Sequence, residues 1–168
     1  TVFSPQTIAP ASQFILSMAV ASAICTALAH YIHADCLQIK WPNDIYWKDK
    51  KIAGILIEND LTGSQISQSI IGIGININQI TQKETDRMEV LNSVLEHIID
   101  LYSRIENRET DIITKIQEYY LKAQYRKEGY HPYCDAKGEF TAKLIRVEPD
   151  GHLILKDKNG SLRKYAFK

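Results

Sequence analysis

Residues 40–47 read KWPNDIYW and residues 51–58 read KIAGILIE, and the remaining sequence can be interpreted around these two segments. The run Leu37–Trp41 is typical of a short β-strand, in which Lys40 points away from the face that carries Ile39. Pro42 has no backbone donor and ends the strand, so the chain must turn directly after the lysine. We therefore expect a hairpin with Ile52–Ile57 as its return strand, and an ammonium group held on a rigid element.

The polar tip of this hairpin, residues 49–51, carries a second cation toward the same end of the sheet. The ammonium groups of Lys40 and Lys51 would repel each other there unless an anion lies between them or solvent separates them. A phosphate or a carboxylate is the kind of group that could interact with both. The hairpin thus indicates a site for an anionic ligand, although a lone lysine at a strand end is more often a solvated charge.

A second β-prone segment, residues 65–78, carries glycines at the alternate positions 72 and 74. One face of this strand is therefore stripped of side chains, which indicates either a ligand close to the backbone or a bulge or tight strand packing. Asn76 follows on the same face, where its amide can offer a donor and an acceptor to a flat heterocycle. No helix with a third glycine follows, so a dinucleotide fingerprint is a poor match. Two lysines for an anionic group and Asn76 for a flat base together indicate a nucleotide as the ligand.

The composition is that of an ordinary globular chain: 168 residues, 45% hydrophobic and 24% charged. Twenty basic and twenty acidic residues give a formal net charge of zero, which favours neither nucleic acid nor a membrane surface as a partner. Cys25, Cys36 and Cys134 are widely spaced and indicate neither a disulfide scaffold nor a zinc site, so we expect a reducing, cytoplasmic setting. No segment has the pattern of a membrane span or a signal peptide.

Helical periodicity and turn signals organise the rest of the chain. Apolar spacing predicts a core helix from about residue 10 to 32, and further helices at residues 85–104 and 110–125. Residues 129–133 are interpreted as a linker. Three strands joined by short turns then predict a small antiparallel barrel or sheet, at residues 138–147, 152–156 and 162–167.

Residues 40–45, 51–58 and 72–76 resemble the motifs of the biotin protein ligase family in kind, order and spacing. The resemblance implies an α+β fold. Residues 1–134 would form the C-terminal portion of the catalytic domain, a mixed β-sheet with flanking helices related to class II aminoacyl-tRNA synthetases. Residues 135–168 would form an SH3-like β-barrel. The implied reaction joins ATP and biotin into biotinyl-5′-AMP with release of pyrophosphate, after which a lysine of a biotin carboxyl carrier protein attacks the mixed anhydride.

The same resemblance assigns roles to individual residues. Lys40 would be catalytic, bridging the biotin carboxylate and the α-phosphate, where a fixed ammonium stabilises developing charge. The substrate- and nucleotide-binding residues would be Asn43 in the loop, Lys51 at the phosphate end, Gly54, Ile55 and Gly72 along the biotin channel, and Gly74 and Asn76 at the adenine. Magnesium should accompany the ATP phosphates, and no motif names its ligands.

Two other interpretations stay open from the sequence. Lipoate protein ligases share a lysine, an Asn-Asp pair and a Lys-Ile-x-Gly pattern, whereas residues 41–42 and the glycine strand favour biotin. A non-catalytic interaction fragment is the second alternative, and a homodimer is compatible with the sequence. The family's Gly-Arg-Gly-x-x-Gly-Arg loop would precede Thr1, so we interpret the chain as a fragment and expect it alone to bind biotin poorly and turn over little.

Overall fold

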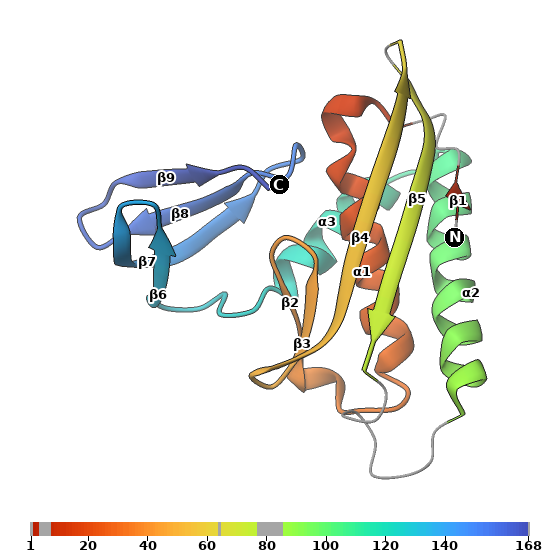
Figure 1. Cartoon of the computed structure of the whole chain (residues 1–168), viewed down its shortest axis with the longest axis horizontal. Coiled ribbons are helices and arrows are strands. Elements are labelled where there is room, and N and C mark those ends of the chain that lie inside the picture. The colour runs from red at the N-terminus through yellow and green to blue at the C-terminus, as the bar shows by residue number, and fades with distance from the viewer. Residues whose placement is uncertain (1, 4–7, 64, 77–85, 168) are drawn as a thin grey trace.

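The computed structural model of the chain describes residues 2–3, 8–63, 65–76 and 86–167. The elements form two β-sheets and three α-helices, and the second sheet lies to one side of the first (Figure 1). The end of the predicted strand at residues 77–78 and the predicted helix start at residue 85 lie outside the described residues. The architecture is α+β, as the sequence predicts.

The first sheet and the helices have the following bounds: β1 Val2–Phe3, α1 Phe14–Leu28, β2 Leu37–Lys40, β3 Asp44–Trp47, β4 Lys50–Thr62, β5 Gln65–Ile75, α2 Arg87–Glu106 and α3 Ile112–Lys122. Two 3₁₀ turns, η1 Pro10–Ser12 and η2 Ala34–Cys36, lead into α1 and β2. The second sheet contains β6 His131–Asp135, β7 Gly138–Val147, β8 Leu153–Asp157 and β9 Leu162–Tyr165. The predicted helices and strands are therefore present, with ends shifted by a few residues.

The first sheet has the strand order β1-β5-β4-β3-β2, and each of its strand pairs is antiparallel. The expectation of a mixed sheet is wrong for the described strands. Successive strands from β2 to β5 are joined by tight turns, and a parallel pair would need a long crossover between them. A single parallel bridge, between Ile39 and Gln124, attaches the end of α3 to the outer edge of β2.

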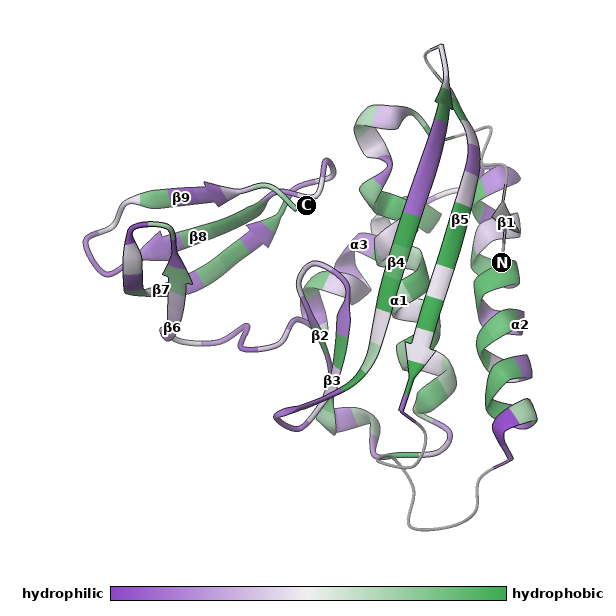
Figure 2. Cartoon of the chain, in the orientation of Figure 1, coloured by the Kyte–Doolittle hydropathy of each residue, from purple (hydrophilic) through white to green (hydrophobic). Residues whose placement is uncertain are grey.

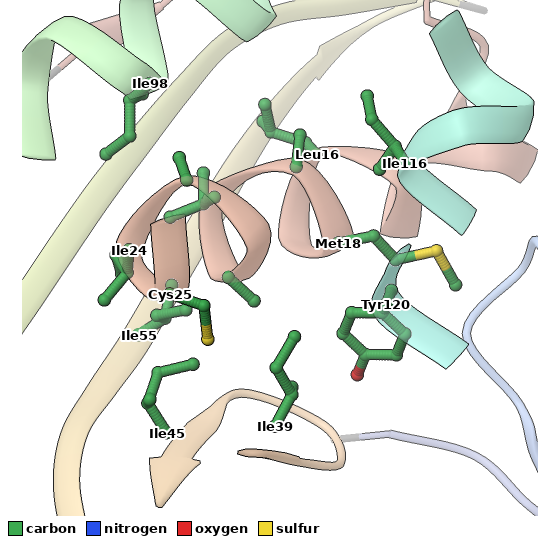
Figure 3. Packing of buried hydrophobic residues seen from close by; sticks show 14 of the residues in the cluster. Leu16, Met18, Ile24, Cys25, Ile39, Ile45, Ile55, Ile98, Ile116 and Tyr120 are labelled. Atoms are coloured by element: carbon green, nitrogen blue, oxygen red, sulfur yellow. The ribbon is translucent and has the colours of Figure 1, made fainter. Parts of the chain in front are cut away.

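Helix α1 covers one face of the first sheet and forms the centre of the core (Figure 3). Its many small residues allow close packing on the strands, and Ala21, Ile24 and Cys25 are at most 1% exposed. Ile39 and Ile45 meet the helix from the sheet. Residues 10–28 are long and apolar enough to span a membrane, but 72% of that window is buried in the fold, as in the core helix of a globular domain.

The other two helices pack beside α1 with amphipathic faces. Asp86 caps α2 by accepting a hydrogen bond from the Met88 backbone N–H at 2.8 Å. The buried stripe of α2 contains Val90, Val94, Ile98 and Ile105, and that of α3 contains Ile112, Ile116 and Tyr120. Burial raises the pKa of Tyr120, which remains a neutral donor and binds the Pro42 carbonyl at 3.1 Å. Helix α3 therefore supports the turn that follows Lys40.

The second sheet has the order β6-β7-β8-β9, with β6 and β9 at its edges. The linker interpretation of residues 129–133 is wrong from His131 onward, because β6 pairs along its length with β7. These four strands form an open sheet, so a closed SH3-like barrel is not confirmed; pairing of β6 with β9 would be needed to close it. The proposed division at residues 134 and 135 stays a prediction, and β6 crosses it.

A hydrogen bond and a ring contact are among the interactions that attach the second sheet to the first part of the chain. The Trp41 indole Nε1 donates to the Gly151 carbonyl at 2.9 Å, and the rings of Phe14 and Phe167 lie 4.9 Å apart. Gly151 has φ +88°, and a Cβ atom there would lie 2.5 Å from the Phe167 ring and 2.6 Å from the Phe14 ring. Because Phe14 is buried in the core, its ring cannot easily move aside for an added methyl group. This glycine permits the two parts to approach each other.

We therefore expect Gly151→Ala to lower the free energy of unfolding by about 2–5 kcal/mol, through backbone strain and overpacking together. Gly160→Ala is the matched control, since Gly160 has φ +87° but its nearest neighbour would be 3.9 Å from an added Cβ. It should cost about 1–2 kcal/mol. Urea unfolding measures both variants, and equal losses would show that the contact with the phenylalanine rings is unimportant.

Candidate functional site

A single row of residues crosses four strands of the first sheet. Lys40 pairs with Asp44, Asp44 with Gly54, and Gly54 with Gly74. Directly paired residues point to the same face of a sheet. The ammonium-bearing residue and the glycine strand thus share one face, as the sequence predicts. We call this face, which lies opposite α1, the open face; it carries Lys40, Asp44, Gly54, Gly72 and Gly74.

The glycines leave the open face bare. A Cβ atom at Gly74 would meet nothing within 4 Å, and one at Gly72 would meet only Leu56, at 3.8 Å or more. Leu56, the strand partner of Gly72, is 60% exposed on this face. Hydrophobic residues (green) accordingly alternate along β5 with residues of intermediate hydropathy (white) in Figure 2. The described residues therefore offer no tight strand packing that explains these two glycines, and the face has room for a flat ligand.

Asn76 lies directly after β5, and its backbone N–H donates to the Ile52 carbonyl at 2.8 Å. This bond holds the exposed residue beside the end of the β4–β5 ladder. By strand alternation Asn76 continues the series of Gly72 and Gly74. The structure therefore keeps all three predicted residues on one edge of the open face.

Lys51 reaches the open face through a β-bulge. Ile45 pairs with Ala53 and Tyr46 pairs with Lys51, so Ile52 is an extra residue in β4. The bulge reverses the alternation, which would otherwise place residues 51 and 54 on opposite faces. Lys51 Nζ then lies 2.6 Å from Asp44 Oδ1, and a Cβ atom at Gly54 would lie 3.2 Å from the lysine side chain. Gly54 thus makes room for the Lys51 side chain.

Asp44 places a carboxylate beside Lys51. It pairs with Lys40 across the hairpin and forms the ion pair with Lys51. Sequence reasoning did not select it, although the hairpin itself places residues 40 and 44 opposite each other. A ligand phosphate near Lys51 would therefore have to share this lysine with a carboxylate.

Lys40 is held by an aromatic neighbour. Its ammonium lies 3.2 Å from the Tyr46 hydroxyl and 5.0 Å from the centre of the Tyr46 ring. Tyr46 stacks on Tyr125 at 4.9 Å, and the Tyr125 hydroxyl donates to Asp49 at 2.8 Å. Partial burial and this bond raise the pKa of Tyr125, which stays protonated as a donor. No sequence motif pointed to these two tyrosines, because residues 46 and 125 meet only in the fold.

Asn43 and Ile55 hold the turn that follows the lysine. Asn43 Nδ2 donates to the Ile55 carbonyl at 2.6 Å, and the Ile55 backbone N–H donates back to the Asn43 carbonyl at 2.9 Å. The Trp41–Pro42 peptide is cis. The Ile55 side chain is 3% exposed in the core beneath the sheet, so the predicted role of Ile55 along a biotin channel could involve only its backbone and stays a prediction (Figure 3). Its strand alternation places only its backbone within reach of the open face.

A cavity of about 660 Å³ adjoins Lys40 and lies between the hairpin and the second sheet. Its walls combine cations with many aromatic and aliphatic side chains: Lys40, Trp41, Tyr46, Asp49, Gln124, Tyr125, Arg126, Pro132, Tyr133, Cys134, Phe140, Leu144, Leu153, Leu155, Tyr165 and Ala166. Concave, mostly apolar surfaces with a few charged groups are typical ligand sites. Lys40 therefore stands between two surfaces that a ligand can use, the open face and this cavity.

The carboxylates near Lys40 already have partners. Asp44 binds Lys51, and Asp49 accepts from Tyr125. Among the described residues, one group of metal-ligand type comes together, Glu148, Asp150 and His152, at a turn of the second sheet. Arg146 and Lys164 form ion pairs with its Glu148. Neither place gathers free oxygen ligands for a hard cation.

Residues 2–76 match the Biotin/lipoate A/B protein ligase family. The antiparallel sheet that carries the bare face and Lys40 lies within this match. The bifunctional ligase/repressor BirA of Bacillus spizizenii is 27% identical over 150 residues, which cover 76% of this chain and 44% of that protein. BirA of Escherichia coli K12 is 41% identical over 70 residues, covering 40% and 21%. The chain thus spans less than half of these relatives.

Solved structures show the same fold over nearly the whole chain. The biotin protein ligase of Aquifex aeolicus superposes with a TM-score of 0.74 at 21% identity, covering 97% of this chain and 76% of that one. The same enzyme in complex with biotin and ATP gives a TM-score of 0.68 at 22% identity, covering 90% and 68%. At such identities the similarity establishes the fold, including the second sheet. The chemistry has to be argued from the residues of the site.

The partly exposed Asp44–Lys51 pair predicts a small contribution to stability. We expect Asp44→Ala to change the free energy of unfolding by less than about 1 kcal/mol, because solvent screens such pairs. The adjacent Ile45→Ala is the matched comparison and should cost about 2–5 kcal/mol, since Ile45 is fully buried. Urea denaturation separates them; a loss at Asp44 as large as that at Ile45 would make this aspartate a structural residue.

Proposed function

We propose that this chain provides the adenylate-forming face of a biotin–protein ligase, which activates biotin with ATP and transfers it to a lysine of a biotin carboxyl carrier protein. The observation that carries the proposal is the row from Lys40 to Gly74. It places a cation and a side-chain-free strand on one face, where an anionic centre and a flat base could lie together. The family match and the ligase names of the relatives support the same activity.

In the proposed first step, a biotin carboxylate oxygen attacks the α-phosphorus of ATP. The bond to the pyrophosphate leaving group breaks, and the mixed anhydride biotinyl-5′-AMP forms. Charge gathers on the equatorial phosphate oxygens in the transition state, and a fixed ammonium on Lys40 would stabilise it. Gly72 would allow biotin to lie close to the strands next to Gly54, whose own space the Lys51 side chain fills in part, and Gly74 and Asn76 would contact the adenine.

In the proposed second step, the unprotonated amine of a carrier lysine attacks the acyl carbon, forms an amide and releases AMP. The proton lost by the amine goes to solvent or to the departing phosphate. Lys40 would again stabilise the anionic phosphate as it leaves. The described residues near the lysine offer no nucleophile–base pair, which agrees with a mechanism based on positioning and charge.

Magnesium would be held mainly by the ATP phosphates, because the neighbouring carboxylates Asp44 and Asp49 are engaged. Bound there, it would neutralise phosphate charge. We also propose a cytoplasmic setting, since Cys25, Cys36 and Cys134 are free thiols. Lipoate remains the second candidate substrate, because the matched family includes lipoate ligases.

We expect Lys40→Ala to reduce adenylate formation by at least about a hundredfold, as expected for loss of a charged transition-state contact. Protein in stoichiometric amount is incubated with α-labelled ATP and either biotin or lipoate, so that even one slow turnover is measured. Lys50→Ala is the matched control, because Lys50 is an exposed lysine at the start of β4 in the same sheet. Product with lipoate alone, or equal product from the alanine variant, would reject the assignment; no product at all favours a non-catalytic fragment.

Gly74→Ala should separate ligand binding from stability. Nothing lies within 4 Å of an added Cβ, and alanine restricts the unfolded chain, so the variant should unfold at equal or slightly higher stability, by up to about 1 kcal/mol. A methyl group on the open face should nevertheless weaken binding of biotinyl-5′-AMP, measured by calorimetry. Gly63→Ala in the β4–β5 turn is the control and should leave binding unchanged. An unaltered affinity of Gly74→Ala for biotinyl-5′-AMP would contradict the proposal that the adenylate lies against this strand.

A further inference from the structure

Lys40 is the outer member of a stacked column of side chains. Its ammonium lies against the hydroxyl and ring of Tyr46, at 3.2 Å and 5.0 Å. The Tyr46 ring packs on the Tyr125 ring at 4.9 Å, with 35° between their planes. The Arg126 guanidinium lies 5.0 Å from the centre of the Tyr125 ring. The column therefore joins the lysine on β2 to the segment that leaves α3.

The base of the column is fixed by the backbone. Ile39 donates its N–H to the Ala123 carbonyl at 2.7 Å, and its own carbonyl accepts from the Tyr125 N–H at 2.8 Å. These bonds attach the segment after α3 to the residue immediately before Lys40. The Tyr125 hydroxyl is fixed separately, by its 2.8 Å bond to Asp49. Tyr125 is thus held at both ends, and its ring is a rigid support for Tyr46.

We propose that Tyr46 and Tyr125 are positioning residues, which hold the Lys40 ammonium at the height and angle that adenylate formation requires. The inference rests on the proposed function, because it assigns Lys40 the stabilisation of the α-phosphate. A lysine has four rotatable side-chain bonds, and an unheld one must lose that freedom in the transition state. A tyrosine whose hydroxyl accepts a hydrogen bond from the ammonium, and whose ring lies beside it, removes part of this cost in advance.

The position of the column also gives the second sheet a part in the reaction. Tyr125 and Arg126 lie in the segment between α3 and β6, and both line the 660 Å³ cavity together with Lys40 and Tyr46. The support on which the lysine rests is thus fixed to the first sheet and borders the second. Trp41, next to Lys40, is tied to that sheet through Gly151.

Two substitutions at one position separate the parts of the contact. Tyr46→Phe keeps the ring and loses the hydroxyl, so the rate of adenylate formation should fall about threefold, whereas Tyr46→Leu removes both and should cost about tenfold or more. The apparent affinity for ATP should change less than the rate, because the lost contact acts on geometry. Tyr125→Leu should also lower the rate of adenylate formation, although Tyr46 itself is unchanged, because Tyr46 loses its support.

Tyr130→Leu is the matched control. Lys143 lies 5.8 Å from the centre of the Tyr130 ring, so the variant removes a comparable lysine–tyrosine contact away from Lys40. It should leave adenylate formation unchanged. Urea unfolding of all four variants checks that the rates compare folded proteins.

A spectroscopic measurement tests the contact without any turnover. Protons on the Lys40 side chain beside the Tyr46 ring should show a ring-current shift in the NMR spectrum of the full chain, and we expect this shift to persist in Tyr46→Phe and to vanish in Tyr46→Leu. Single-turnover adenylate formation with biotin is then measured on the same samples. The expected result is that the variant without the ring loses both the shift and the rate.

The outcomes distinguish the inference from the function on which it rests. Absence of adenylate in the wild-type chain, with Lys40→Ala indistinguishable from it, rejects the proposed function, and the inference falls with it. Adenylate that forms at the wild-type rate in Tyr46→Leu overturns the inference and leaves the ligase assignment in place. A faster rate in that variant would also overturn it, since Tyr46 would then restrain the lysine from the site.

Discussion

The burial of one sheet face against α1 is the constraint on which the rest of this structure depends. Ile39 and Ile45 have no exposed surface beneath the helix, and a slip of one residue in either strand would turn them to solvent. The register of the hairpin is therefore strongly determined. With the register fixed, Lys40, Asp44, Gly54 and Gly74 have to emerge on the opposite face in one row.

The open face has a cost that a purely structural sheet would avoid. Glycine in a strand loses more conformational entropy on folding than other residues and contributes no packing. The same face leaves Leu56 and Ile70 60% and 43% exposed. Local departures of this kind gather at functional sites. The strength of the α1 core allows the sheet to carry them.

The second sheet is more than an attached module. The indole of Trp41 binds the Gly151 carbonyl, and Tyr125 supports Tyr46 just before β6 begins. Both connections end next to Lys40. The similarity in fold to solved biotin protein ligases extends over this sheet as well as the first. The lysine environment is thus assembled from both parts of the chain.

The sequence by itself determined what depends on local pattern. Strand alternation placed Lys40 away from Ile39, paired glycines marked a bare face, and helical periodicity located all three helices. The ligase motifs were also local, which is why they could be recognised. The predictions of a mixed sheet and of a linker at His131 were wrong. They depend on which strands become neighbours and which face the core covers.

Only the tertiary structure decided which groups surround the lysine. The bulge at Ile52 brings Lys51 to Asp44, although simple alternation would separate residues 51 and 54. Tyr125 reaches Tyr46, 79 positions away in the sequence, because the segment after α3 pairs with the edge of β2. Such contacts follow from long-range packing, which propensity and spacing along the chain do not encode.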